Sequence, residues 1–565
     1  MNPVQQTAPK ELQPSRETPQ RVQVRSPATK TNWLRSWVLI NATLSGALAL
    51  VWLILRSGAK PSRLAYPCQQ AALGTATAAL GAPLVAAALT FRKRLLLLLS
   101  TPVGRAAMGT LVLAGGVGLI AAASRNPGSG PTLADPPPGY APEAFVVHNA
   151  RGIIDGRYGG VDDLVTLMGL RGRKLYRSAT VSLYSGPEGI IASDDVVLIK
   201  INQQWSQRGG TNTDVLRGLI RRIVEHPDGC PREIVVVENG QGSGSFTRTQ
   251  NNAQNPAQSP QNVVNDFAAA GYPVSTWLWD TIRYNSVQEY AAGDLNDGYV
   301  VNPNPDPESS IRVSYPKFRT AGGRYVSMKR GLWDPVSQTY DNARLKFINL
   351  PVLKCHSIYG VTAMVKHHMG VVTRELSTNS HYAIRTGGLG SYMAEVRVPD
   401  LNILDCIWIL ARPGSGPSAS YAEATRVDKL IAGFDPVALD MWAVKYVLVP
   451  AILANGYSSY PNQDPDNEIG AFRYYIDRTM SEMLAGGIPT TNDYRSVRVH
   501  TWSGDLDGDG AVDLSDFLIF QQCFGGSGNP PAPTCPPSLN ADLDLDGDVD
   551  LADFLIFQQN FTGSL

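Results

Sequence analysis

A segment of twenty residues occurs twice near the end of the chain and restricts what that region can fold into. The first copy starts at Asp505 and reads DLDGDGAVDLSDFLIFQQCF, and the second starts at Asp542 and reads DLDLDGDVDLADFLIFQQNF. Each copy has Asp at loop positions one, three, five, nine and twelve, and Gly at position six. Oxygen ligands at alternate positions, with a glycine for the sharp turn, are what a hard cation such as calcium requires of a twelve-residue loop.

The two loops therefore predict two Ca²⁺ sites, built from carboxylates and from the backbone carbonyl at position seven. A solvated Asp-rich turn is the alternative, but the pattern occurs twice and an apolar helical segment follows each copy. The predicted ligands are Asp505, Asp507, Asp509, Ala511, Asp513 and Asp516 in the first loop, and Asp542, Asp544, Asp546, Asp548, Asp550 and Asp553 in the second.

No predicted helix precedes either loop, so each unit is a loop plus a helix and not a full EF-hand. In its spacing, its duplication and its Asp at position twelve, the region at 503–565 resembles the type I dockerin module. The resemblance implies calcium binding, a cohesin-like protein partner and a connection with polysaccharide breakdown. The positions that correspond to partner recognition hold Leu, Phe and Ile here, whereas dockerins usually have small polar residues there.

Three apolar segments near the start of the chain predict a membrane region of about three helices at 32–123. The first segment, Trp33–Leu55, is long enough to span a bilayer core of roughly 30 Å, and Leu64–Phe91 and Leu95–Ala123 follow it. Residues 1–31 are rich in Gln, Pro, Thr and Arg, a composition that predicts a disordered cytoplasmic tail. A cleaved signal peptide is the alternative interpretation of the first segment.

Basic residues beside the apolar segments predict their orientation. By the positive-inside rule, the basic groups before Trp33 and at 92–105 lie in the cytoplasm, and everything after Ala123 lies outside. Arg56, Lys60 and Arg63 fall in the loop left outside, against the rule. The prediction is a multi-pass membrane protein with a large extracytoplasmic C-terminal region. The chain has 49 Lys plus Arg and 49 Asp plus Glu, so its net charge gives no indication of a nucleic-acid partner.

A Pro/Gly linker at 124–144 leads into a globular domain predicted at 145–502. Apolar strand-like runs alternate with helical patterns through this region, which predicts an α/β fold, a mostly parallel sheet with helices on both faces. The predicted strands are Val196–Ile201, Glu233–Val237, Val274–Leu278, Phe347–Leu350 and Ile403–Leu410, and the predicted helices are Thr213–Glu225, Val263–Ala270 and Val437–Val449.

Three motifs in this domain resemble the family called domain of unknown function 362. They are VLIKIN at 197–202, INLPVLKCHSIYGVTAMVKHHMG at 348–370 and LIAGFDPVALD at 430–440. The family usually has K-P-N in the first motif and K-N-x-M-G at the end of the second, where this chain has K-I-N and K-H-H-M-G. Many members also carry a ferredoxin-like cysteine cluster, which this sequence lacks. The resemblance names no activity, so whether the domain is an enzyme stays open.

Polar and charged residues at the ends of the predicted elements form a candidate ligand site. Side chains that follow parallel strands meet at the carboxyl edge of a sheet, where a cationic set would suit a small anionic ligand. The alternative is that the lysines are ordinary edge residues and the Asp at the helix start is only a cap. The candidate residues are Lys200, Asn202, Lys354, His356, Lys366, Asp435 and Asp440.

Three other features are weaker candidates. His356, His367 and His368 offer imidazole ligands for a metal, although adjacent histidines on a regular element point in different directions. The turn NGQGSGS after Glu238 is a candidate phosphate cradle or, alternatively, a flexible loop. Cys523 and Cys535 lie on opposite sides of a short segment and predict a disulfide outside the cytoplasm.

Two classes of function fit these features. The first is a membrane-anchored extracytoplasmic protein that presents an α/β ligand-binding or catalytic domain, with the calcium module serving protein assembly. The second is a non-catalytic cell-surface component whose role is calcium-dependent assembly alone. A ligand or metal that copurified with the domain would favour the first class.

Overall fold

The computed structural model describes residues 135–561 except for 149, 151–152, 155–156, 378–379, 502–503, 508–511, 537–538, 540 and 544–546. The predicted tail (1–31), the predicted membrane region (32–123) and most of the linker (124–144) lie outside the described residues. So do four predicted calcium ligands, Asp509, Ala511, Asp544 and Asp546. The chain divides into two compact units, Met1–Thr132 and Leu133–Leu565, and every described residue belongs to the second.

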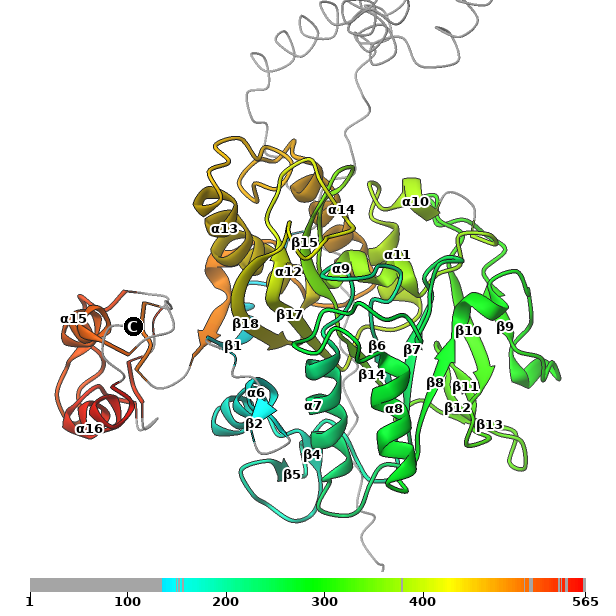
Figure 1. The fold of residues 1–565 in the computed structure, drawn as a ribbon, viewed down its shortest axis with the longest axis horizontal. Helices are drawn as coiled ribbons and strands as arrows, with labels where there is room; N and C mark the ends of the chain where they lie inside the picture. The colour runs from blue at the N-terminus through cyan, green and yellow to red at the C-terminus, as the bar shows by residue number, and fades with distance from the viewer. Residues whose placement is uncertain are drawn as a thin grey trace, which may run out of the picture. The chain divides into compact units, whose positions relative to one another are not determined.

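The largest sheet has ten strands and forms the centre of the α/β domain (Figure 1). Its main path runs β19-β1-β18-β17-β14-β6-β7-β8, and β15 joins it beside β17 and carries β16 on its other side. The strands are β1 (Glu143–Val147), β6 (Val196–Lys200), β7 (Glu233–Glu238), β8 (Val274–Leu278), β14 (Leu345–Asn349), β15 (Val352–His356), β16 (Gly360–Thr362), β17 (Leu401–Leu410), β18 (Thr425–Gly433) and β19 (Arg498–His500).

Parallel pairing dominates where the apolar strand runs are continuous. In the run β17-β14-β6-β7-β8 each strand is parallel to the next, and every residue of β6 and β7 is buried. Strands buried on both faces need no alternation of polar and apolar residues, which is why VVLIK and EIVVVE form central strands. Antiparallel pairing appears at β18, which runs against both β17 and β1. The α/β class expected from the sequence is confirmed.

Helices cover both faces of this sheet and divide its side chains between two cores. Val197 and Ile199 of β6 face a core shared with the first set of helices, whereas Val196 and Leu198 face a core shared with the second set. The first set is α6 (Gly159–Leu170), α7 (Thr213–Val224) and α8 (Pro260–Ala269), and the second is α11 (Gly388–Glu395), α12 (Pro436–Ala443), α13 (Val449–Ala454) and α14 (Ala471–Ala485) (Figure 1).

A second, antiparallel sheet of five strands lies between β8 and β14 in the sequence. Its strands have three to six residues, too few for a clear periodic pattern, so the sequence did not predict them. In sheet order they are β13 (Thr339–Asp341), β12 (Gly331–Asp334), β11 (Tyr325–Ser327), β10 (Ser314–Arg319) and β9 (Gly298–Val301). Two smaller two-stranded sheets pair β2 (Ile153–Ile154) with β3 (Arg157–Tyr158) and β4 (Tyr176–Arg177) with β5 (Ser185–Gly186).

Within the described residues, one helical run is long and apolar enough to cross a membrane. It is Pro436–Ala454, which joins α12 and α13 through the π-helical turn η5 (Val444–Leu448). Because 67% of its most apolar window is buried inside the protein, the run is a core helix of the α/β domain.

The end of the described chain forms a small helical module that we call the calcium-loop module. It comprises residues 504–507, 512–536 and 539–561, with the gaps given above. Helices α15 (Leu514–Cys523) and α16 (Leu551–Asn560) follow the two loops, and Phe517 and Phe520 of α15 contact Phe554 and Phe557 of α16. Leu518 and Leu555 of the same helices are 61% and 54% exposed. The predicted disulfide between Cys523 and Cys535 is present.

Candidate functional site

A cleft of about 290 Å³ opens at the carboxyl ends of β6, β7 and β15. Three short elements complete its wall: α9 (Met364–His367), the 3-10 turn η4 (His368–Gly370) and α10 (Ser380–Ala383). Its charged and titratable lining residues are Lys200, Glu238, His356, Tyr359, Lys366, His367, Arg374 and His381. This is the edge of a parallel sheet at which ligands usually bind.

The structure brings four of the seven candidate residues, Lys200, Asn202, His356 and Lys366, into this cleft. Lys354 lies fully buried beside it and donates a hydrogen bond from Nζ to the carbonyl of Gly209. Burial, reinforced by the nearby Lys366, lowers the pKa of Lys354 to about 7. Lys354 therefore adds to the positive potential behind the cleft without lining it.

Asp435 and Asp440 do not line the cleft, so the expectation that they would share it needs correction. Asp435 caps α12 by accepting hydrogen bonds from the amides of Val437 and Ala438. Asp440 accepts hydrogen bonds from the amides of Met364 and Val365 at 2.8 and 2.9 Å. These amides begin α9, so Asp440 fixes the start of the helix that carries Lys366 and His367. Burial raises the pKa of both carboxyls, to about 6 for Asp435 and about 8 for Asp440.

A buried ion pair forms the floor of the cleft. Lys200 Nζ donates hydrogen bonds to Glu238 Oε2 at 2.6 Å and to the carbonyl of Ile201 at 3.0 Å, and it lies 2.9 Å from His367 Nε2. Burial lowers the pKa of Lys200 and raises that of Glu238, and their mutual attraction opposes both shifts. A Cβ on Gly370 would lie 2.4 Å from Lys200 Nζ, so any side chain at the end of the K-H-H-M-G motif would force Lys200 to move.

Asn349 fixes the proton on His367. Its amide nitrogen donates to the carbonyl of Met364 at 3.2 Å and to Asn402 Oδ1 at 2.9 Å, so its oxygen faces His367 Nδ1 at 2.6 Å. An oxygen can only accept, and Nδ1 therefore carries the proton while Nε2 accepts from Lys200. Burial and the neighbouring Lys200 hold the pKa of His367 well below its usual value, so the ring is neutral.

Lys366 differs from the other buried lysines. Five lysines of the described chain are buried, and four of them have an oxygen acceptor within 4.0 Å: Lys200, Lys317, Lys346 and Lys354. The side-chain ammonium of Lys366 has neither a hydrogen bond nor an ion pair with any described residue; its Nζ lies 5.4 Å from the centroid of the Tyr359 ring. Burial lowers the pKa of Lys366 to about 7.

The three histidines do not converge on a metal. His356 Nδ1 accepts from the amides of Ile358 and Tyr359, His367 is held between Lys200 and Asn349, and His368 Nδ1 faces backbone carbonyls of α9. Among the described residues, groups of three or more potential metal ligands occur at Asp505, Asp507 and Asp516, and at Asp548, Asp550 and Asp553.

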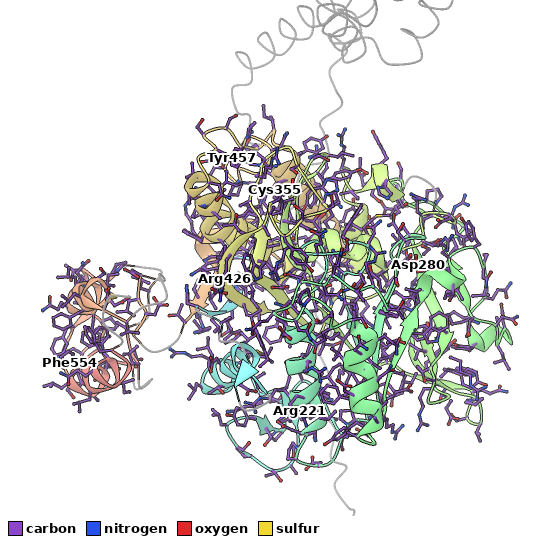
Figure 2. The ribbon with its side chains drawn as sticks, viewed as in Figure 1. Arg221, Asp280, Cys355, Arg426, Tyr457 and Phe554 are labelled. Atoms are coloured by element: carbon purple, nitrogen blue, oxygen red, sulfur yellow. A yellow bond between two sulfur atoms is a disulfide. The ribbon has the colours of Figure 1, made fainter. Side chains whose placement is uncertain are left out.

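The glycine-rich turn after β7 already holds an anion that belongs to the protein. The carboxylate of Asp280 (labelled in Figure 2), from the 3-10 helix η2 (Trp279–Ile282), accepts hydrogen bonds from the amides of Gly240, Gly242 and Gly244. These are the amides that a bound phosphate would use. The turn therefore stabilises the wall of the cleft and does not act as the phosphate cradle considered from the sequence.

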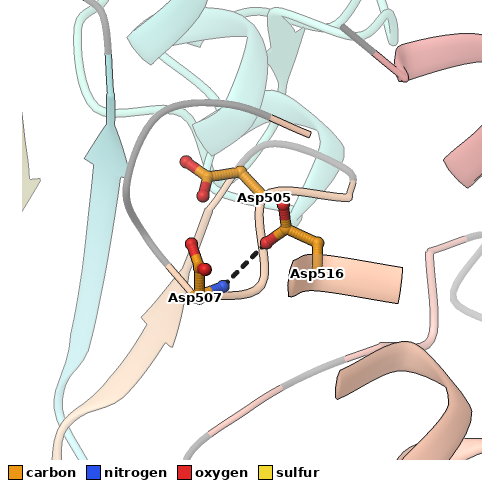
Figure 3. Close-up of side chains that lie close together, drawn as sticks. All are labelled: Asp505, Asp507 and Asp516. Atoms are coloured by element: carbon orange, nitrogen blue, oxygen red, sulfur yellow. Dashed lines mark hydrogen bonds between the residues drawn. The ribbon is translucent and has the colours of Figure 1, made fainter. Parts of the chain in front are cut away.

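The calcium-loop module brings together some of the carboxylates that its spacing predicts, whereas Asp513 and Asp542, which are also described, belong to neither of its two acidic groups. Oxygens of Asp505, Asp507 and Asp516 lie within 4.8 Å of one another (Figure 3), and so do those of Asp548, Asp550 and Asp553. An all-oxygen, highly acidic set suits Ca²⁺, which these residues would hold together. In the second group Asp548 contributes a carboxylate, where the sequence suggested its carbonyl.

Two of the predicted ligands in each loop also start the following helix. Asp513 caps α15 by accepting from the amide of Ser515, and Asp516 Oδ2 accepts from the amide of Asp513 at 2.9 Å. Asp550 and Asp553 form the same reciprocal cap on α16. Asp516 Oδ1 also accepts from the amides of Leu506 and Asp507. Loop closure and helix initiation are therefore coupled through the same carboxylates.

Comparisons with known families match the α/β domain and the calcium-loop module separately. Residues 333–445 match the family described as domain of unknown function (DUF362), and residues 503–562 match the dockerin type I domain. The two matches confirm the domain architecture expected from the sequence. Dockerin modules bind calcium and cohesin partners, so the match supports calcium-dependent protein assembly. Searches among curated proteins and among solved structures found no match.

Several residues of the cleft were not predicted from the sequence. Glu238 ends an apolar strand just before the glycine-rich turn, and Asn349 interrupts the apolar run of β14. A polar residue inside a buried strand was the available signal for both. Tyr359, Arg374 and His381 lie in loops or at a short helix, where one sequence offers no comparable signal.

Proposed function

We propose that the α/β domain binds a small anionic ligand, a carboxylate or a phosphate ester, in the cleft at the carboxyl edge of its sheet. The observation that carries the proposal is Lys366, a buried cationic side chain that lines the cleft and has no anionic partner among the described residues. Taking an ammonium group out of water costs several kcal/mol unless an opposite charge compensates. A ligand anion would supply that charge.

The surrounding charges favour the same ligand class. Lys366 acts electrostatically on Lys354, His356 and His381, and lowers the pKa of each. Arg374, on the cleft wall, is 55% exposed and 3.7 Å from its neighbour Glu375. The one lining carboxylate that is buried, Glu238, is already engaged by Lys200. The positive charges of the cleft thus exceed the negative ones, and an anion of a few carbon atoms fits its volume.

The test is ligand binding by the full chain in detergent, measured calorimetrically against phosphate, pyruvate and citrate. Lys366→Met should weaken binding of the preferred anion about 10- to 100-fold, because a charge-assisted contact contributes roughly 1.5–3 kcal/mol. The matched control is Lys445→Met, which removes a lysine that pairs with Asp466 away from the cleft lining and should bind like the wild type. Absence of binding by the wild type would favour the non-catalytic assembly component instead.

We further propose that the chain anchors this domain on the outer face of a membrane and that the calcium-loop module attaches a cohesin-like partner there. The apolar segments and their basic flanks support the anchor, and the disulfide between Cys523 and Cys535 supports an oxidising compartment. The dockerin match supports the partner class, and through it a connection with polysaccharide breakdown. Protease added to intact cells should release residues after the linker; protection until lysis would contradict the orientation.

A further inference from the structure

We propose that Lys366 is a nucleophile: its Nζ forms an imine with the carbonyl carbon of a small anionic oxo compound, such as a 2-oxo acid, bound in the cleft. This inference rests on the proposed anion site and assigns it a substrate class and a covalent step. It begins from the position of the amine, which lies at the cleft on an otherwise buried side chain that is 8% exposed.

A lysine that attacks carbonyl carbon must be partly uncharged at neutral pH. The environment of Lys366 meets this requirement because no carboxylate pairs with it. The charged or titratable groups around it are Lys354, His356, Tyr359 and His381. Lys200 and Glu238, which also line the cleft, form an ion pair in which each charge compensates the other. Burial alone accounts for the lowered pKa of the Lys366 ammonium, which keeps about half of the amine neutral near pH 7.

The alternative role, a lysine that only pairs with the ligand's charge, fits the environment less well. The four other buried lysines each have an oxygen acceptor within 4.0 Å, so their amines are already engaged by the protein. The Lys366 amine lies over the aromatic ring of Tyr359, whose hydroxyl donates a hydrogen bond to the carbonyl of His381. Its amine is thus left free to react, while Arg374 on the same wall can hold the ligand's carboxylate.

The proposed step balances without an oxidant or a cofactor. The Nζ lone pair attacks the carbonyl carbon, the carbonyl oxygen takes up a proton to give a carbinolamine, and the nitrogen loses its proton. Loss of the hydroxyl as water leaves the C=N bond of the imine. The carboxylate of the ligand does not react and stays bound. The protons come from and return to water, to which the cleft is open.

The experiment is reductive trapping on the full chain in detergent with pyruvate or glyoxylate and cyanoborohydride, followed by peptide mass spectrometry. We expect an adduct at Lys366 at least about tenfold more abundant than at Lys445, a partly exposed lysine that pairs with Asp466 and whose unreactive ammonium form dominates near pH 7. Lactate, which has the carboxylate but no carbonyl, should bind competitively and give no adduct. Lys366→Arg replaces the primary amine by a guanidinium, which does not form an imine, and should therefore lose the adduct.

A second measurement on the wild-type chain does not depend on any variant folding. The rate of acylation of Lys366 by a lysine-specific reagent, followed from pH 5 to 10, should rise with a midpoint near 7, whereas that of Lys445 should rise only at the end of this range. Anion binding without an adduct at Lys366, or an acylation midpoint near that of Lys445, would overturn the imine and leave the anion site intact. Loss of binding as well would overturn both proposals.

Discussion

The calcium loops and the cleft both gather charges of one sign, but they do so by different routes. In the loops, the aspartates lie within twelve residues of one another, and their own backbone amides hold them, as Asp516 shows. In the cleft, the basic side chains come from segments more than 150 residues apart, as Lys200 and Lys366 show. The first arrangement is a local motif and the second a product of tertiary structure. Binding of a cation by the loop carboxylates should therefore affect the stability of the calcium-loop module alone. Disturbing the charged groups of the cleft should change the stability of the whole α/β domain.

The largest expected effect is that of calcium removal on the calcium-loop module. In the full chain, a chelator should accelerate hydrogen exchange in α15 and α16 by about 100-fold or more, because the unshielded carboxylates repel one another and the loops anchor the helices. Exchange in β6 and β7, measured in the same samples by mass spectrometry, should not change. Helices that kept their protection under chelation would show that the loops do not depend on calcium.

The next effect tests the floor of the cleft. Glu238→Ala removes the partner of Lys200 and leaves its ammonium buried without compensation, which should destabilise the α/β domain by about 3–5 kcal/mol. Urea unfolding followed by tryptophan fluorescence measures the loss. Glu423→Ala, which breaks the exposed pair with Arg412, is the control and should cost about 0–1 kcal/mol. Equal losses in the two variants would contradict the importance of burial.

The smallest effect should be a gain in stability. The folded-state pKa of Lys366, about 7, lies below its unfolded value of 10.5, so between these values the unfolded chain binds more protons and stability rises with pH. Lys354 contributes in the same direction. Lys366→Met should therefore stabilise the fold by about 1–3 kcal/mol at pH 6. Thermal unfolding from pH 6 to 10 should show the difference shrinking as pH rises; a difference independent of pH would contradict the assigned charge state.

Sequence reasoning succeeded where the chemistry or the packing is local. The aspartate spacing predicted both acidic clusters, and the continuous apolar runs of β6, β7 and β17 predicted central strands. It failed where a role depends on a distant partner. Asp440 resembles a site residue in sequence, yet its carboxylate is used by the amides of Met364 and Val365. Glu238 carried no expectation because its partner, Lys200, lies 38 residues away.

The five-stranded sheet shows a further limit. Its strands are short, and β10 contains Pro316, a residue that argues against strand formation when only the sequence is known. Tertiary pairing with β9 and β11 overrides that local preference. Propensity alone does not include the free energy that such non-local pairing supplies.

Gln241, in the glycine-rich turn, connects three walls of the cleft. The turn places it in the left-handed region at φ 53°, from which its amide group donates to the carbonyl of Met369 at 2.7 Å and accepts from His381 at 2.8 Å. Since Asp280 holds the same turn through its glycine amides, these walls have little conformational entropy left to lose when a ligand arrives. Cleft walls that are ordered before binding would favour rapid, shape-selective binding of a rigid ligand over adaptation to a flexible one.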